Sequence, residues 1–259
     1  MNVGLIGCGN MARAMARGWG RPVLCFDPLA ERAEALAGEL GGEALSSNAE
    51  VASRTDLVVL CHKPAQLGAV ADEVAPAAKA VASILAATPL SALKNVYPGI
   101  PVYRFLPSLP AEVRRGAVVQ AVDPKREATL GRGDTVDAQV RGLFAELGTL
   151  VPLDDALVDV AMGLMSCAPA YVALVAEAQV DAGVRRGIPP AQASALVTET
   201  LAGTAELLRR RNYDTLAVRR EVSSPGGATA RGLAALERGG VRTAFSDALD
   251  AVLGEGTQQ

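Results

Sequence analysis

Val3-Gly4-Leu5-Ile6-Gly7-Cys8-Gly9-Asn10-Met11-Ala12 is the stretch that decides the fold of this 259-residue chain. A short apolar run forms a strand, and a G-x-G-x-x-A turn leads from it into a helix. Gly7 permits the tight turn, Gly9 lets the backbone approach a pyrophosphate, and Ala12 lets helix and strand pack closely. The helix N-terminus presents its N–H groups to that anion. The predicted cofactor-binding residues of this turn are Gly7, Gly9, Asn10, Met11 and Ala12.

An acidic residue stands where the second strand ends. Asp27 follows Gly7 by 20 residues, the spacing at which a dinucleotide-binding fold places a carboxylate beside the adenosine ribose. Such a carboxylate accepts hydrogen bonds from the ribose hydroxyls of NAD and repels a 2′-phosphate. Two alternatives stay open: Asp27 as a simple turn residue before Pro28, and Arg32 as a contact for a 2′-phosphate. The predicted cofactor is NADH or NADPH, and Asp27 mildly favours NADH.

The first half of the chain alternates short apolar runs with helical patterns. The run Leu57–Cys61 is nearly all apolar, which is typical of a strand covered on both faces in a parallel sheet. Alternating strands and helices indicate βαβ units and a doubly wound α/β domain of the Rossmann type. The predicted strands are Val3–Ile6, Pro22–Phe26, Leu57–Cys61, Val81–Leu85 and Pro101–Leu106, and the clearest helices extend to about Trp19 and over Ala30–Leu40.

Strand patterns stop at about Asp154, and an all-α second part follows. Its helices are apolar around much of their circumference, which indicates burial on more than one side. A region of this size gives little room for that within one chain, so we expect a homodimer formed through it. The predicted boundary divides residues 1–153 from residues 154–259. The predicted helices are Val158–Arg186, Pro189 to about Arg211, Asp214–Glu221, Gly227–Glu237 and Arg242–Leu253.

Composition excludes several classes of protein. Half of the residues are apolar, a fifth are charged and the net charge is −3, as in a soluble globular protein and unlike a basic nucleic-acid binder. The four cysteines form no C-x-x-C pair and His62 is the only histidine, so no metal site is expected. No apolar run approaches the ~20 residues that span a bilayer. We expect a cytoplasmic protein without membrane or nucleic-acid partners, and a frayed tail at residues 254–259.

Two further segments carry polar groups suited to binding. Cys61-His62-Lys63-Pro64 closes the third clear strand, where His62 is either a general acid or, as we favour, a strand-end residue beside the cofactor. Ser223-Ser224-Pro225-Gly226-Gly227-Ala228-Thr229 lies between two predicted helices. Its hydroxyls and backbone amides form an anion cup at a helix N-terminus, fit for a carboxylate or a phosphate. The alternative for this segment is an ordinary turn with a serine N-cap.

Taken together, these motifs resemble the pyrroline-5-carboxylate reductase family over nearly the whole chain. The turn Gly7–Ala12 resembles the family's cofactor loop, and the segment Ser223–Thr229, the family's most specific signature, is intact. The other segments that carry the resemblance are His62–Pro64, Arg104–Ser108, Leu143–Val160, Ala168–Tyr171, Asp181–Val184, Leu233–Glu237 and Gly239–Arg242.

The resemblance implies a fold, a reaction and an assembly. The fold is a Rossmann domain followed by a helical dimerisation domain. The reaction is the reduction of L-1-pyrroline-5-carboxylate to L-proline, the last step of proline biosynthesis, by hydride transfer from NAD(P)H to a cyclic imine carboxylate. The assembly is a homodimer through the helical domain, and the resemblance also allows a ring of dimers.

The resemblance also implies site residues. Thr229 is the implied catalytic residue, because its hydroxyl lies near the imine nitrogen in this interpretation. The implied substrate-binding residues, which hold the carboxylate, are Ser224, Gly226, Gly227, Ala228 and Thr229. Asn48 falls where the family has an asparagine beside the adenosine, and His62, Lys63 and Pro64 fall in its cofactor-binding A-V-K-P segment.

Several positions depart from the family's pattern, among them Cys61 and His62, which stand where the family has Ala and Val before Lys-Pro. Ser108 replaces an asparagine in the R-x-M-P-N segment, Met165 and Cys167 are bulkier than the usual serine, and Ala168 replaces a glycine. We expect these positions to surround the nicotinamide and the substrate, so they bear on substrate identity or activity rather than on the fold. Two alternatives therefore stay open: a divergent imine or keto-acid reductase of the same superfamily, and a nucleotide-binding paralogue without catalysis.

Overall fold

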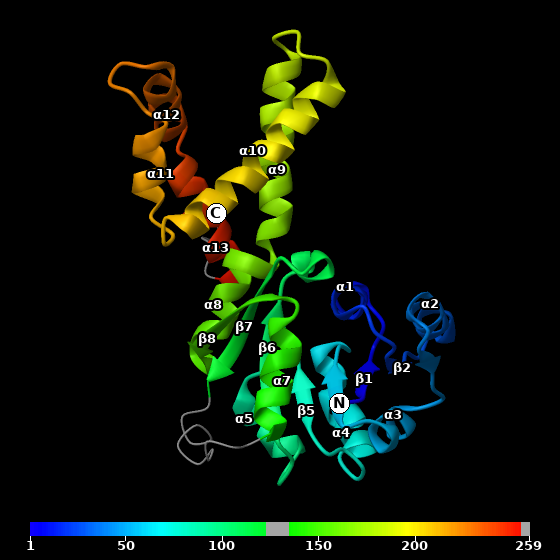
Figure 1. Cartoon of the computed structure of the whole chain (residues 1–259). Coiled ribbons are helices and arrows are strands. Elements are labelled where there is room, and N and C mark those ends of the chain that lie inside the picture. Colours follow the sequence, from blue (N-terminus) through cyan, green and yellow to red (C-terminus); the bar gives the residue numbers. More distant parts are fainter. Residues whose placement is uncertain (123–134, 255–259) are drawn as a thin grey trace. The chain divides into compact units, whose positions relative to one another are not determined.

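The computed structural model describes residues 1–122 and 135–254, which belong to two compact units (Figure 1). The first unit is Met1–Pro169 and the second is Ala170–Gln259. The predicted boundary lies between residues 153 and 154, so residues 154–169 belong to the first unit rather than to the second. Of the tail predicted to fray, residues 254–259, all but Gly254 lie outside the described residues.

A single sheet forms the centre of the first unit. Its strands are β1 (Val3–Ile6), β2 (Leu24–Phe26), β3 (Glu43–Ala44), β4 (Leu57–Leu60), β5 (Val81–Ser83), β6 (Val102–Pro107), β7 (Gly116–Val122) and β8 (Gly148–Asp154). Their order is β3-β2-β1-β4-β5-β6-β7-β8, and every neighbouring pair is parallel except β6 and β7. The predicted doubly wound α/β class is confirmed, whereas β3, β7 and β8 were not predicted.

Helices connect and cover these strands. They are α1 (Asn10–Trp19), α2 (Ala30–Leu40), α3 (Asn48–Arg54), α4 (Leu67–Val74), α5 (Leu90–Val96), α7 (Thr135–Ala145) and α8 (Val158–Ala161), with 3₁₀ turns at Pro64–Gln66, Leu109–Val113 and Asp155–Leu157. Helix α3 begins after Ser47, whose side chain accepts a hydrogen bond from the Glu50 amide. Helix α1 ends at Gly20, which adopts the left-handed conformation that suits glycine.

The apolar strands are covered on both faces. Leu57 and Val59 belong to one buried cluster, and Val58 and Leu60 belong to another. Successive residues of a strand point to opposite faces of the sheet, so the two clusters lie on opposite sides of it. This double coverage confirms the prediction made from the run Leu57–Cys61.

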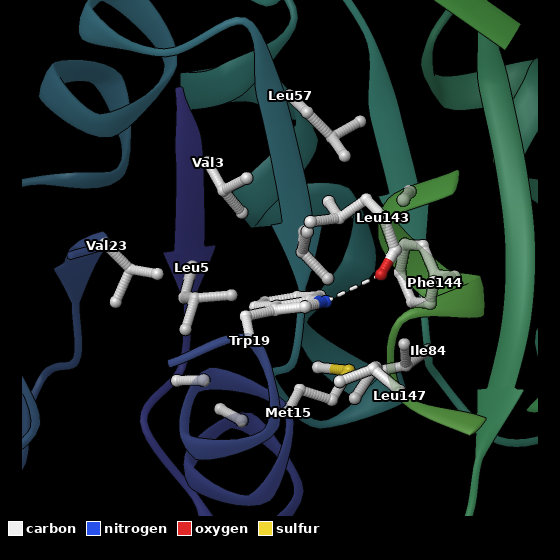
Figure 2. Close-up of a cluster of buried hydrophobic side chains, with 14 of the residues drawn as sticks. Val3, Leu5, Met15, Trp19, Val23, Leu57, Ile84, Leu143, Phe144 and Leu147 are labelled. Atoms are coloured by element: carbon white, nitrogen blue, oxygen red, sulfur yellow. Dashed lines mark hydrogen bonds between the residues drawn. The ribbon is translucent and has the colours of Figure 1, made fainter. Parts of the chain in front are cut away.

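One of these clusters brings α1 and α7 together, although they are far apart in the sequence (Figure 2). The indole N–H of Trp19 on α1 donates a hydrogen bond to the Leu143 carbonyl oxygen on α7, at 2.9 Å. The Trp19 ring also meets the Phe144 ring edge-on, with ring centroids 5.9 Å apart. Because the only polar group of the indole is paired, the ring is buried without an unsatisfied donor.

The second part of the chain is helical, as predicted, but its first helix is not regular. The helices are α9 (Ala168–Val184), α10 (Pro190–Arg210), α11 (Thr215–Glu221), α12 (Ala228–Arg238) and α13 (Val241–Leu253). The prediction of one helix over Val158–Arg186 is corrected, because a π-helical turn at Met162–Ser166 separates α8 from α9. The Cys167 amide donates to the Met162 carbonyl oxygen five residues earlier, which inserts an extra residue into the turn.

One helical segment, Asp155–Val184, is long and apolar enough to cross a membrane by length and composition alone. The expectation that no such segment exists is wrong, because it considered only uninterrupted apolar runs, and acidic residues such as Asp159 and Glu177 divide this one. No residue of α9 is buried in the single chain, and Val172 and Leu174 are more than half exposed. An apolar surface of this kind needs a partner that covers it.

Candidate functional site

A cavity of about 620 Å³ lies at the carboxyl ends of β1, β2 and β4. Ile6, Phe26 and Cys61, at or next to the last residue of each strand, line it. Strand order reverses between β1 and β4, since β2 and β3 lie on one side of β1 and the later strands lie beyond β4. Ligands of open α/β sheets bind at such a switch point. The cavity is therefore the candidate cofactor site of the first unit.

Most of the predicted cofactor-binding residues line this cavity. Those that line it are Gly7, Gly9, Asp27, Asn48, His62 and Lys63. Asn10, Met11 and Ala12 form the first turn of α1, and Pro64 begins a 3₁₀ turn; these four are not among the lining residues. A cofactor role for them stays a prediction.

The glycine turn has the geometry that a dinucleotide needs. Gly7 has a φ of +93°, and a Cβ on it would lie 2.8 Å from the Cys61 carbonyl oxygen, so the turn has no room for a side chain there. A Cβ on Gly9 would meet no atom within 4 Å. The Gly9 backbone therefore borders open space at the N-terminus of α1, where a pyrophosphate fits.

Asp27 holds this turn in place. The side chain is 8% exposed, and its Oδ2 accepts a hydrogen bond from the Cys8 amide at 2.8 Å. Its Oδ1 accepts from the Leu29 amide at 2.9 Å. The carboxylate thus ties the end of β2 to the turn that follows β1. Each oxygen retains a further lone pair, so Asp27 remains able to accept a hydrogen bond from a ligand hydroxyl.

The His62 ring donates one hydrogen bond in this structure and keeps its other nitrogen as an acceptor. Its Nδ1 lies 2.9 Å from the Lys63 carbonyl oxygen, and because a carbonyl only accepts, Nδ1 carries the ring hydrogen. Burial lowers the pKa of His62, which keeps the ring neutral near pH 7. Its Nε2 is buried and has no partner among the residues that the structure describes. This state favours a strand-end residue beside the cofactor over a general acid.

Sequence reasoning missed the residues of one helix that also line the cavity. Gln66, Ala69, Val70 and Glu73 come from the 3₁₀ turn after Pro64 and from α4. They recur at intervals of three and four residues, which is the spacing of one helical face. That periodicity, read from Pro64 as a helix start, is the signal that would have found them.

The segment predicted to bind the substrate forms one tight turn in the second unit. Gly226 has a φ of +69°, and the Gly227 amide donates to the Ser224 carbonyl oxygen at 3.0 Å. A Cβ on Gly227 would lie 2.4 Å from the Ser224 hydroxyl and 3.1 Å from the Ser224 carbonyl oxygen, so a side chain there would displace the hydroxyl. The turn leads into α12, whose first residues are Ala228 and Thr229. Ser224, Gly226, Gly227, Ala228 and Thr229 are thereby brought together at a helix N-terminus, which favours an anion.

Ser108, one of the departures from the family's pattern, has a local structural role. Its hydroxyl accepts a hydrogen bond from the Ala117 amide at 2.9 Å and donates to the Ala117 carbonyl oxygen at 3.1 Å. The side chain therefore joins the end of β6 to β7, the antiparallel pair of the sheet. Met165 lies in the π-helical turn and Cys167 directly after it.

Comparisons with known proteins identify relatives of this chain. Residues 155–258 match the family described as "Pyrroline-5-carboxylate reductase dimerisation", and residues 2–87 match "NADP oxidoreductase coenzyme F420-dependent". The chain is 36% identical to pyrroline-5-carboxylate reductase of Thermus thermophilus, over 99% of this chain and 97% of that protein.

Solved structures of pyrroline-5-carboxylate reductases share the fold of this chain. The structure of 1-pyrroline-5-carboxylate reductase from Streptococcus pyogenes shares 27% identity with a TM-score of 0.84, and the match covers 98% of this chain and 97% of that one. Pyrroline carboxylate reductase of Plasmodium falciparum, solved with NADP bound, shares the fold at 24% identity and a TM-score of 0.83, over 97% of this chain and 95% of that one.

The dimerisation match also accounts for the apolar helices of the second part. It covers α9 to α13 and all of the segment Asp155–Val184, several of whose apolar side chains are exposed in the single chain. This region is a dimerisation domain, so the exposed surface is the one that homo-oligomerisation covers. The resemblance found in the sequence motifs is confirmed over the whole chain. The chain belongs to the pyrroline-5-carboxylate reductase family of oxidoreductases.

Proposed function

We propose that this protein reduces L-1-pyrroline-5-carboxylate to L-proline with a nicotinamide dinucleotide. The observation that carries the proposal is the 36% identity to a pyrroline-5-carboxylate reductase over nearly the whole of both chains. Support comes from the intact glycine turn of the first unit and the intact Ser223–Thr229 turn of the second. When bound, the dinucleotide supplies the hydride that reduces the carbon of the cyclic imine.

The residues of the chain then bind and orient the two reactants. The turn at Gly7 and Gly9 receives the pyrophosphate, and Asp27 and Asn48 face the adenosine half. The amides of Gly226–Thr229, together with Ser224, hold the substrate carboxylate at the N-terminus of α12. The Thr229 hydroxyl donates a hydrogen bond to the imine nitrogen, and the proton that this nitrogen gains during the reduction comes from solvent water. Fixing the reactants in this way is the protein's main contribution to the rate.

The first prediction tests this function directly. The wild-type chain is expected to oxidise NADH or NADPH only when pyrroline-5-carboxylate is present, as followed by the absorbance of the reduced nicotinamide. Thr229→Ala is expected to lower kcat about tenfold or more, because one hydrogen bond that strengthens in the transition state is lost. Thr229→Ser is the matched control, since it keeps the hydroxyl and is expected to retain most of the activity.

Two outcomes count against the proposal. A wild-type chain that binds the dinucleotide without oxidising it in the presence of this substrate points to another cyclic imine, to a keto acid or to a non-catalytic role. The departures at Ser108, Met165, Cys167 and Ala168 then become the first positions to exchange. An unchanged kcat for Thr229→Ala removes Thr229 from the chemistry without affecting the family assignment.

We also propose that the cofactor preference is for NADH, because the Asp27 carboxylate accepts from the ribose hydroxyls and repels a 2′-phosphate. Asp27→Ser is expected to raise the ratio of kcat/KM for NADPH to that for NADH. The values for both cofactors are expected to fall, since the Cys8 and Leu29 amides lose their acceptor. Asp27→Asn isolates the charge, because its amide oxygen still accepts from one of these backbone amides. A ratio that does not move in either variant would rule out the ribose contact.

The assembly proposed is a homodimer through the helical domain, with a ring of such dimers as the larger form. The apolar exposed faces of α9 and α10 support a partner there, because Val172, Leu174 and Leu196 are each at least half exposed in the single chain. Its location in the cytoplasm stays a prediction.

A further inference from the structure

Asn48 has one half of its carboxamide paired and the other half unpaired. The residue begins α3, lines the cavity and is 8% exposed. Its Nδ2 donates a hydrogen bond to Oε2 of Glu73 at 3.1 Å. Glu73 lies 25 residues further along the chain, on α4. Its Oδ1 is shielded from solvent and has no hydrogen-bond partner in the described part of the chain.

The partner determines which way this amide faces. A carboxylate only accepts hydrogen bonds, so Glu73 selects the orientation in which the NH₂ group points toward α4 and the carbonyl oxygen points away from it. Without Glu73 the two orientations of the carboxamide differ little in energy, and the side chain would present either an acceptor or a donor. Glu73 therefore decides the polarity of Asn48.

An unpaired buried acceptor calls for a donor. Leaving it unsatisfied is costly, so such a group in a native protein has a reason to persist. Two other lining residues also present acceptors, because the His62 Nε2 has no partner among the described residues and Asp27 presents carboxylate oxygens. The adenosine half of a dinucleotide brings hydroxyl and amine donors, which match this set of acceptors.

We propose that Glu73 is a positioning residue for the adenosine half of the cofactor. By binding Asn48 Nδ2, it fixes Asn48 Oδ1 as the acceptor for a hydroxyl or amine donor of the adenosine. Glu73 needs no contact with the dinucleotide for this role. The role depends on an oxygen that accepts from Asn48 Nδ2 and not on the negative charge of Glu73. The inference rests on the proposed use of a nicotinamide dinucleotide, and it does not depend on which imine is reduced.

The test is a calorimetric titration of the full-length protein with NADH in the absence of an imine. Glu73→Ala is expected to raise the Kd about fivefold, the effect of one hydrogen bond that is no longer held ready. Glu73→Gln is expected to stay close to wild type, because its amide oxygen still accepts from Asn48 Nδ2. Asp72→Ala is the matched control, since it removes the neighbouring carboxylate of α4, which does not line the cavity.

A double-mutant cycle separates positioning from a direct or a general structural effect. Asn48→Ala alone is expected to weaken NADH binding, and adding Glu73→Ala to it is expected to change nothing further. The proposal is overturned if Glu73→Ala leaves the Kd unchanged, if it is equally harmful in the Asn48→Ala background, or if Glu73→Gln is as weak as Glu73→Ala. A chain that binds NADH as described but does not reduce pyrroline-5-carboxylate contradicts the proposed reaction and leaves this inference intact.

Discussion

Replacing Asp155 and Asp159 together by asparagine is expected to lower the free energy of unfolding by about 3 kcal/mol. Both carboxylates pair with Arg104 on β6, whose side chain is only 1% exposed. The distances are 2.8 Å from Nη1 to Asp155 Oδ1 and 2.7 Å from Nη2 to Asp159 Oδ1. Without them a buried guanidinium is left unpaired, which is the costly way to break an ion pair.

The magnitude follows from the unequal burial of the partners. Breaking a buried pair costs about 3–5 kcal/mol, and the lower end applies because Asp159 is 38% exposed and partly screened by water. In wild type, Asp159 accepts a hydrogen bond from the Ala87 amide and Asp155 accepts one from the Leu90 amide. Asparagine preserves the shape of each side chain and keeps an oxygen for these amides. The charge is therefore the main property removed.

Urea unfolding at one fixed protein concentration measures the effect, because oligomerisation makes the apparent stability depend on concentration. Adding Arg104→Met to the double variant is expected to restore much of the loss, since the unpaired charge is then gone. A double variant within about 1 kcal/mol of wild type, the range of surface ion pairs, would show that Arg104 does not depend on these partners.

The variant Gly7→Ala is expected to bind NADH about a hundredfold more weakly, or about 2.7 kcal/mol less favourably. Gly7 has a φ of +93°, and the new Cβ would lie 2.8 Å from the oxygen and 2.9 Å from the carbon of the Cys61 carbonyl. Neither side can move freely, because β1 and β4 are paired from Val3 to Ile6. The turn must therefore shift, and its amides then lose their alignment with the pyrophosphate.

Two glycine variants serve as controls for Gly7→Ala. Gly9→Ala is expected to weaken NADH binding without loss of stability, because its Cβ meets no protein atom within 4 Å but enters the space that the cofactor fills. Gly38→Ala in α2 has equally free space and does not line the cavity, so binding is expected to stay unchanged. Wild-type affinity in Gly7→Ala, measured by the same calorimetric titration, would contradict the role assigned to this turn.

Several elements escaped the sequence analysis for identifiable physical reasons. Strand β8 contains Pro152, and proline argues against a strand unless the strand lies at an edge, which is where β8 lies. Whether a strand is at an edge depends on the whole sheet and is not visible locally. The π-helical turn at Met162–Ser166 likewise leaves the apolar pattern of a helix nearly unchanged, so the sequence there predicts a regular helix.

The sequence by itself determined the elements whose signals are local. Three such elements are the turn at Gly7 and Gly9, the apolar run Leu57–Cys61 and the segment Ser223–Thr229. Each carries its own conformational requirement, and together they predict the fold class and the family. Local sequence was enough because the conformation of a glycine and the apolar pattern of a strand are set within a few residues.

Only the tertiary structure decided which distant polar groups meet. Asn48 pairs with Glu73, and Arg104 pairs with Asp155 and Asp159, across separations of 25, 51 and 55 residues. Hydrogen bonds form only within about 3 Å and along narrow directions, and close ion pairs form only within about 4 Å. Such partners are therefore fixed by the path of the backbone through the whole sheet, which no local pattern of residues contains.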